Sequence, residues 1–335
     1  MHTHRLNGLL ALLAIAAAAH ASYGKPELIR AENLKTDLEF IADDLLEGRG
    51  TPSRGLDLAA LYLRSQLKHM GAIPAGDLGT FYQSFRVERR GIGGRTQNIV
   101  AIIPGRDPVL KNEYVAISAH YDHLGLAKTG LDTVFNGADD DGSGTTSVLS
   151  IARAFAMGPR PKRSILIIWH AGEERGLLGA KHFTSNPTVP LDKIVGLLNI
   201  DMIGRSRPAG DANPKNAKLS GPDEIYVVGS REISKEFGDI VEKVNRKTTK
   251  LKYNYYYDLP EKPEGIAHRS DHWEYLKRNV PIAFWFDGVH EDYHMVTDEI
   301  GKIDFAKMER VARAVYATAW TFAEAPKRPK LDATR

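Results

Sequence analysis

The stretch SILIIWHAGEERGLLGA, residues 164–180, holds the pattern that decides the fold. It begins with a short apolar run rich in isoleucine, which is typical of a strand buried on both faces of a sheet. The acidic residues Glu173 and Glu174 follow, and a helical pattern covers residues 176–186. The stretch therefore predicts a buried strand that leads through an acidic loop into a helix.

Similar apolar runs recur along the chain and alternate with helical patterns. The other expected strands are NIVAIIPG (98–105), EYVAISAHYD (113–122), VGLLNIDMIG (195–204), EIYVVGS (224–230) and VPIAFWFDG (280–288). The other expected helices cover residues 144–157, 231–246, 271–278 and 304–323. Strands that alternate with helices predict an α/β domain with a mostly parallel central sheet flanked by helices.

The residues before this core have a helical pattern. Apolar residues recur at helical spacing over residues 31–46 and 56–70, with a turn-rich segment between them. No linker interrupts residues 98–323. We therefore expect one domain over residues 22–335, with the N-terminal helices packed on the core.

Residues 1–21 have the layout of a secretory signal peptide. A polar, positive start precedes the apolar run LLALLAIAAAA at residues 9–19, and a small-x-small pattern ends at Ala21. The apolar run is too short to span a bilayer. We expect export through a cleaved signal peptide to a periplasm or the extracellular medium, with no stable membrane association of the mature chain.

Composition limits the partners and the kind of metal site. The formal net charge is +3, which gives no reason to expect nucleic acid or an anionic membrane as the main partner. The chain has no cysteine, so it forms no disulfide. Any metal site must use His, Asp and Glu, which favours a catalytic centre over a cysteine-rich structural zinc.

The predicted strands end in residues that can bind metal. EYVAISA leads to His120 and Asp122, SILIIW leads to Glu173 and Glu174, and VGLLNI leads to Asp201. In open α/β sheets, ligands bind beyond the carboxyl ends of the strands. Three strands are thus expected to deliver imidazole and carboxylate groups to one edge.

Each of these signals has a structural alternative. Asp122 can accept the second ring N–H of His120, but a lone histidine is more often structural. The acids Asp139, Asp140 and Asp141 fit a cation-binding loop or a solvated helix cap. Of the pair Glu173 and Glu174, one can bind metal and the other act as general base, or both can belong to an acidic helix start.

Taken together, the ordered motifs resemble the secreted di-zinc aminopeptidases, a family related to glutamate carboxypeptidase and glutaminyl cyclase. The segments that carry the resemblance are SAHYDHLG, NGADDDGSGT, AGEERGLLG, LNIDMIG, RSDHWEYLKRNVPIAFW and YHMVTDE. The resemblance covers most of residues 31–323. It implies a three-layer α/β sandwich of the zinc exopeptidase type. Residues 25–98 are too few to hold an inserted protease-associated domain together with the two helices, so we expect none.

The resemblance also implies a role for each site residue. Asp140 would bridge two Zn²⁺ ions, His120 and Asp201 would complete one site, and Glu174 and His294 the other. Glu173 would be the general base and acid, and Asp122 would orient His120. The Asp140–Asp141 peptide bond is often cis in this family. Manganese or cobalt can substitute for zinc in such a site.

The implied reaction is hydrolysis of the N-terminal bond of peptides that have a free amino group. Some relatives place an oxyanion-supporting tyrosine just before the Ser-Asp-His motif, but Gly265 to Arg269 contain none. Either a tyrosine of the cluster Tyr255–Tyr257 takes this role or lines the substrate pocket, or that cluster only packs within its loop. The alternatives are a glutaminyl cyclase, a carboxypeptidase or dipeptidase on the same scaffold, or a binding module without catalysis.

Overall fold

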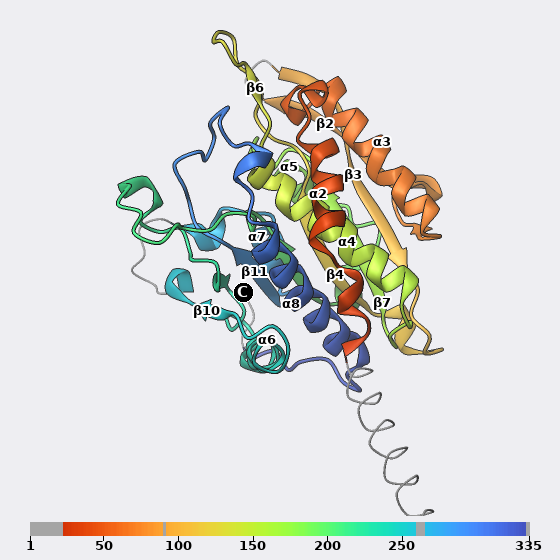
Figure 1. Cartoon of the computed structure of the whole chain (residues 1–335). Helices are drawn as coiled ribbons and strands as arrows, with labels where there is room; N and C mark the ends of the chain where they lie inside the picture. Colours follow the sequence, from red (N-terminus) through yellow and green to blue (C-terminus); the bar gives the residue numbers. More distant parts are fainter. Residues whose placement is uncertain (1–22, 90–91, 259–264, 333–335) are drawn as a thin grey trace, which may run out of the picture.

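The computed structural model describes residues 23–89, 92–258 and 265–332 (Figure 1). The expected signal peptide, residues 1–21, lies outside the described residues. Within the described ranges, no helix is both long and apolar enough to cross a membrane.

The centre of the molecule is a nine-stranded mixed sheet with the order β1-β3-β7-β4-β8-β11-β9-β10, and β2 pairs with β3. Its strands are β1 Ile73–Pro74, β2 Tyr82–Arg89, β3 Ile92–Ile103, β4 Tyr114–His120, β7 Ser164–His170, β8 Ile194–Ile200, β9 Glu224–Val228, β10 Lys252–Asn254 and β11 Ile282–Phe286. The central strands β7, β4, β8 and β11 are mutually parallel. Antiparallel pairing joins β3 to its neighbours and β9 to β11.

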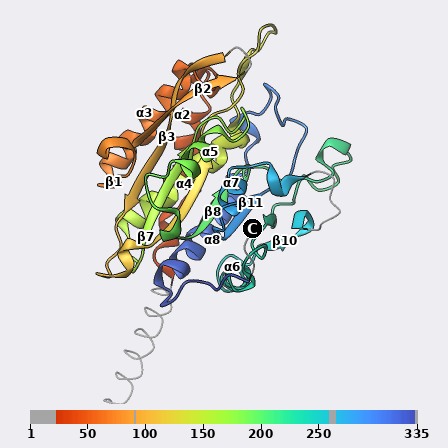
Figure 2. The ribbon, with the colours of Figure 1, turned by 180° about the vertical axis from the view of Figure 1, so that it is seen from behind.

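Helices cover both faces of this sheet and give the three expected layers. The helices are α2 Ala31–Ile41, α3 Arg54–His69, α4 Gly144–Met157, α5 Leu178–Ser185, α6 Lys235–Lys247, α7 His272–Leu276 and α8 Phe305–Glu324. The face seen in Figure 1 carries α2, α4 and α8, and Figure 2 shows the molecule from behind. The α/β class with flanking helices is confirmed, and the parallel part of the sheet is its centre.

Alternation along β7 explains why the sheet has two cores. Ile165, Ile167 and Trp169 belong to the larger core, which also contains residues of α2, α3, α4, α6 and α8. Leu166 and Ile168 point the other way, into a second core with residues of α5 and α7. Successive strand side chains face opposite sides, so a nearly continuous apolar run fills both cores.

The N-terminal segment differs from the expectation at one helix end. The helix expected over residues 31–46 stops at Ile41, and the chain then takes left-handed conformations at Glu47, Gly48 and Arg49. Arg49 is buried, and its guanidinium donates hydrogen bonds to the carbonyl oxygens of Ile41, Tyr121, Asn136 and Gly137. The helix ends early because the chain turns inward to tie these loops together.

The strand β2 was missing from the sequence-based expectation, and β3 begins six residues earlier than the expected residue 98. Along β2, Gln83, Phe85 and Val87 are buried while Ser84 and Arg86 are exposed. This alternation is the signature of a half-buried strand. It is less conspicuous than the continuous apolar runs because only every second residue is buried.

Candidate metal centre

The candidate site lies at the carboxyl edge of the parallel strands. His120 ends β4, Glu173 and Glu174 follow β7, and Asp201 follows β8. Because β7, β4 and β8 are parallel neighbours, their carboxyl ends meet at one edge. Asp140 lies in the turn Ala138–Ser143 before α4, and His294 lies in the loop between β11 and α8.

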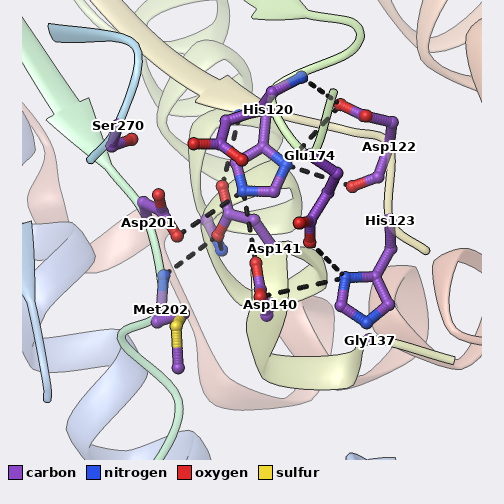
Figure 3. Close-up of polar contacts among 12 residues, drawn as sticks. His120, Asp122, His123, Gly137, Asp140, Asp141, Glu174, Asp201, Met202 and Ser270 are labelled. Carbon is purple, nitrogen blue, oxygen red and sulfur yellow. Dashed lines mark hydrogen bonds and ion pairs between the residues drawn. The ribbon is translucent and has the colours of Figure 1, made fainter. Parts of the chain in front are cut away.

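One side of the site brings His120 and Asp201 together around one oxygen of Asp140 (Figure 3). The His120 Nε2 atom lies 3.3 Å from Asp140 Oδ1 and 3.6 Å from Asp201 Oδ1. His120 and Asp140 are almost completely buried, and Asp201 is 7% exposed. The three residues from separate segments therefore form one group of metal-ligand type.

The other side uses the second oxygen of Asp140. His294 Nε2 lies 3.2 Å from Asp140 Oδ2 and 3.2 Å from Glu174 Oε2. The imidazole of His294 is partly open to solvent, whereas the carboxylate of Glu174 is buried. Each carboxylate oxygen of Asp140 thus faces a different histidine, which is the arrangement expected of a bridging ligand. All five predicted ligands meet at the site.

Asp141 positions the surrounding loops. Its carboxylate accepts hydrogen bonds from the backbone amides of His120, Gly144 and Met202. These contacts join the end of β4, the start of α4 and the end of β8. Asp141 also lies close enough to His120 and Asp201 to form a potential ligand group with them. The Asp140–Asp141 peptide bond is cis, as the resemblance implies.

Asp122 contacts both His120 and the loop of Glu173. The closest acceptor to His120 Nδ1 is the main-chain carbonyl oxygen of Asp122 at 3.0 Å, while its carboxylate lies 3.7 Å away. That carboxylate accepts the Glu173 amide at 3.1 Å and the Thr51 hydroxyl at 2.8 Å. Asp122 therefore orients the imidazole chiefly through its backbone, and its side chain holds the loop of Glu173.

Two further residues at the site were missed by the sequence argument. His123 is fully buried, and its Nδ1 lies 2.9 Å from Glu174 Oε1 and 3.9 Å from Asp140 Oδ2. The carboxylate of Asp298 accepts the backbone amides of Asp139 and Asp140, which ties the His294 loop to the turn of Asp140. Both residues lie inside the quoted motifs, but residue type alone gave no signal for these contacts.

The electrostatics of the site favour a bound cation. Burial raises the pKa of Asp201, although nearby His120 opposes the change. Burial lowers the pKa of His294, but Asp140 and Glu174 outweigh it and raise the value to about 10. Several carboxylates packed this closely away from water repel one another. Positive charge among them would relieve that repulsion.

The donor set also fits a metal ion. Among the described residues, both ring nitrogens of His123 and the Oε1 atom of Glu174 are buried without a satisfied hydrogen bond, although Nδ1 lies 2.9 Å from Oε1. Asp140, Glu174 and His123 form a second potential ligand group beside that of His120. Imidazole nitrogens and carboxylate oxygens are ligands that zinc uses in catalytic sites. The residues therefore fit two neighbouring metal ions of this kind.

A cavity opens beside the acids. Its lining residues are Asp140, Glu173, Asp201, Met202, Ile266, Arg269, Phe284, Phe286, Val289 and Tyr293. One end is therefore acidic and most of the remaining wall is apolar. The ring of Tyr293 stacks on His294 with 3.8 Å between ring centroids.

The cluster Tyr255–Tyr257 does not line this cavity. The Tyr255 hydroxyl donates to Glu242 at 2.5 Å, and Tyr257 packs against Tyr226 and Phe286. The cluster therefore packs, as the second interpretation expected, but against α6, β9 and β11 rather than within its own loop. Tyr293 is the tyrosine that reaches the acidic end of the cavity.

The α/β fold and the imidazole–carboxylate cluster at one sheet edge are those of a metal-dependent hydrolase. The chain belongs to peptidase family M28, which matches residues 98–319. Its reaction class is therefore hydrolysis of peptide bonds.

Two curated relatives agree with this assignment. A probable zinc metalloprotease of Leptosphaeria maculans is 25% identical over 315 residues, covering 85% of this chain and 71% of the relative. Leucine aminopeptidase 1 of Trichophyton rubrum is 28% identical over 231 residues, covering 65% of this chain and 56% of the relative. The chain thus spans little more than half the length of the latter protein.

Solved structures share the fold. The LapA aminopeptidase of Legionella pneumophila superposes with a TM-score of 0.66 at 22% identity, covering 93% of this chain and 75% of that one. The glutaminyl cyclase of Porphyromonas gingivalis superposes with a TM-score of 0.65 at 18% identity, covering 87% of this chain and 98% of that one. Because both activities occur on similar folds, the fold alone does not choose between them.

Proposed function

We propose that the chain is a zinc aminopeptidase that removes the N-terminal residue of peptides with a free amino group. The observation that carries the proposal is the placement of Asp140, whose two oxygens face two separate histidines at 3.2 and 3.3 Å. The names of the relatives, a zinc metalloprotease and a leucine aminopeptidase, support both the metal and the activity.

Two zinc ions would be held by the five predicted ligands. His120 and Asp201 would serve one ion, Glu174 and His294 the other, and Asp140 both. Bound zinc supplies Lewis acidity that activates water and polarises a carbonyl group. The hydrogen bond between His120 Nδ1 and the Asp122 carbonyl leaves Nε2 free to act as a ligand.

Glu173 would move the protons. Its carboxylate lines the cavity, and the Asp122 carboxylate holds its backbone amide. Burial raises the pKa of Glu173 well above its usual range, although His120 opposes this effect. A carboxylate with a raised pKa can accept a proton from the attacking water and then donate it to the leaving amine nitrogen.

The cavity walls suggest how a substrate would be bound. The free amino group would lie near Asp140, Glu173 and Asp201, and an apolar first side chain would pack among the apolar wall residues. The Tyr293 hydroxyl would donate a hydrogen bond to the developing oxyanion, in place of the tyrosine that some relatives carry just before the Ser-Asp-His motif. Among uncharged N-terminal residues, we expect a preference for large apolar ones.

The direct test is hydrolysis of aminoacyl-p-nitroanilides and their N-acetylated forms by the purified mature chain, with and without a zinc chelator. We expect chelator-sensitive cleavage of free-amine substrates, restored by zinc, and no cleavage of the acetylated ones. Cyclisation of N-terminal glutamine without anilide hydrolysis would instead favour a glutaminyl cyclase. Cleavage of acetylated and free substrates alike would contradict exopeptidase action from the N-terminus.

We also propose that the chain is exported and cleaved after Ala21. The support is the sequence pattern of residues 1–21. N-terminal sequencing of the protein recovered outside the cytoplasm should begin at Ser22. An intact N-terminus on a protein retained in the cytoplasm would contradict export.

A further inference from the structure

Arg269 is the basic residue that lines the cavity beside the metal centre. No ion pair joins it to a carboxylate among the described residues. Its Nη2 atom donates a hydrogen bond to the Tyr293 hydroxyl at 3.0 Å, and its guanidinium carbon lies 5.8 Å from the centre of that ring. Tyr293 in turn stacks on His294. The guanidinium of Arg269 is therefore next to the site and still has N–H groups that can donate hydrogen bonds to a ligand.

The backbone at Arg269 is anchored to the sheet. The next residue, Ser270, accepts a hydrogen bond at 3.0 Å from Asn199, which lies within β8 two residues before Asp201. The His272 ring stacks on Phe284 of β11 with 4.4 Å between ring centroids. These contacts fix the base of the Arg269 side chain, while the side chain itself is exposed to solvent. A guanidinium carried by an anchored segment of backbone is suited to bind a ligand.

The charges around the cavity are separated. Asp140, Glu173 and Asp201 form the acidic end, the middle of the wall is apolar, and Arg269 supplies positive charge. A peptide amine matches the acidic end, and an apolar side chain matches the wall. Nothing in an uncharged anilide matches the guanidinium. Arginine pairs best with carboxylates, which it can bind through two parallel hydrogen bonds.

We propose that Arg269 binds a carboxylate of the substrate and so sets the substrate class of the proposed aminopeptidase, on which this inference rests. That carboxylate has two sources: the C-terminal carboxylate of a dipeptide, or the acidic side chain of the N-terminal residue. In either case the enzyme discriminates among peptides by a charge that is not part of the scissile bond.

The test compares matched substrates that differ only in this charge. For the first source the pair is Leu-Gly and its amide Leu-Gly-NH₂, and for the second it is the p-nitroanilides of Glu and Gln. We expect kcat/KM for the carboxylate member of one pair to exceed its partner by about tenfold or more, as for a charge-assisted hydrogen-bonded pair. The pair that shows the preference identifies the source.

Variants then assign the preference to Arg269. Arg269→Gln should reduce the kcat/KM ratio of the preferred pair to near one, and Arg269→Lys should keep part of it because charge remains without the planar fork. Arg86→Gln, which alters an exposed arginine on β2, is the matched control and should leave the ratio unchanged. If Arg269→Gln lowers kcat/KM equally for both substrates of the pair, so that their ratio is unchanged, Arg269 acts through Tyr293 alone. That result would overturn the proposal.

A binding measurement separates failure of this inference from failure of the proposed function. Calorimetry on zinc-loaded Glu173→Gln protein should show tighter binding of the carboxylate ligand than of its uncharged partner, and adding Arg269→Gln should remove the difference. This outcome supports carboxylate recognition even if the wild-type chain hydrolyses no peptide. Equal affinities for both members of both ligand pairs in the zinc-loaded protein would overturn the proposal.

Discussion

The strand β7 and the metal site at the carboxyl edge of the sheet are both buried. The strand is built from apolar residues, whereas the site is built from ionisable ones. Ile165, Ile167 and Trp169 are 0% exposed and pack in the larger apolar core. At the edge, His120 and Asp140 are 1% and 3% exposed, yet they are ionisable. Burial stabilises the body of the strand by removing apolar surface from water. At the edge the same burial intensifies repulsion among carboxylates.

This difference indicates that the apolar strands determine the stability of the fold, and that the ionisable edge determines metal binding and catalysis. Removing side chains from the strand body should lower the free energy of unfolding whether or not metal is present. Removing a charge from the edge should affect metal binding and catalysis and cost the metal-free fold little. Four predictions follow from this division, beginning with the largest expected effect.

Glu173→Gln should lower kcat by about 10³-fold, within the range known for loss of a general acid–base group. Gln keeps the shape of the side chain but cannot exchange protons at neutral pH. Zinc content should match that of the wild-type chain, because Glu173 is not among the five expected ligands, and thermal stability should be no lower, because burial disfavours the charged form of Glu173. Steady-state kinetics with metal analysis provides the check, and retention of more than a tenth of kcat would contradict the role.

Ile167→Ala should lower the free energy of unfolding by about 2–5 kcal/mol, as for other large-to-small changes in a packed core. Ile167 is fully buried in the centre of the sheet. The loss should be the same with and without zinc, measured by denaturant unfolding. The matched control is Leu131→Ala, at a fully exposed leucine, where the change should stay within about 0.5 kcal/mol. Equal losses for the two variants would contradict the burial argument.

Asp201→Asn should abolish most of the stabilisation that zinc gives. For a ligand at 100 times its Kd, binding to the folded chain adds about 2.7 kcal/mol to the free energy of unfolding. The metal-free variant should be at least as stable as the metal-free wild type at pH 7, because burial raises the pKa of Asp201 and disfavours its charged form. Thermal unfolding with and without zinc measures both effects. An unchanged zinc effect would exclude Asp201 as a ligand.

His123→Gln should weaken zinc binding by about 10-fold, at the lower end of the range for residues that support metal ligands. The His123 ring lies 2.9 Å from Glu174 Oε1, whereas His294 lies 3.2 Å from the other oxygen, Oε2. At saturating zinc the variant should still bind as many ions as the wild type, counted by competition titration with a chelating dye. Loss of a whole ion at saturation would make His123 a direct ligand instead.

The sequence predicted best those parts of the molecule in which a local pattern by itself determines the secondary structure. The continuous apolar runs predicted β4, β7 and β8, and their polar ends predicted the edge that collects His120, Glu174 and Asp201. Alternating runs such as β2 were missed, since half of that strand faces solvent. The helix end at Ile41 was also missed, because the buried contacts of Arg49 determine it.

The finer parts of the site depend on contacts between distant loops. His123 and Tyr293 lie beside predicted ligands in the sequence, but only the fold brings them against Glu174 and His294. Asp298 reaches the amides of Asp139 and Asp140 across more than 150 residues of chain. Residue type and spacing carry no information about such pairings, so these roles required the structure.

The most direct test of the account is the number of zinc ions bound per chain in the wild type, in Asp140→Asn and in Glu173→Gln, measured by elemental analysis after metal loading and dialysis. The account predicts two ions for the wild type, two for Glu173→Gln, and loss of zinc from Asp140→Asn, because its carboxylate faces both histidines. Two ions retained in Asp140→Asn, or none bound by the wild type, would contradict the claim that the acidic edge of the sheet is a two-zinc centre.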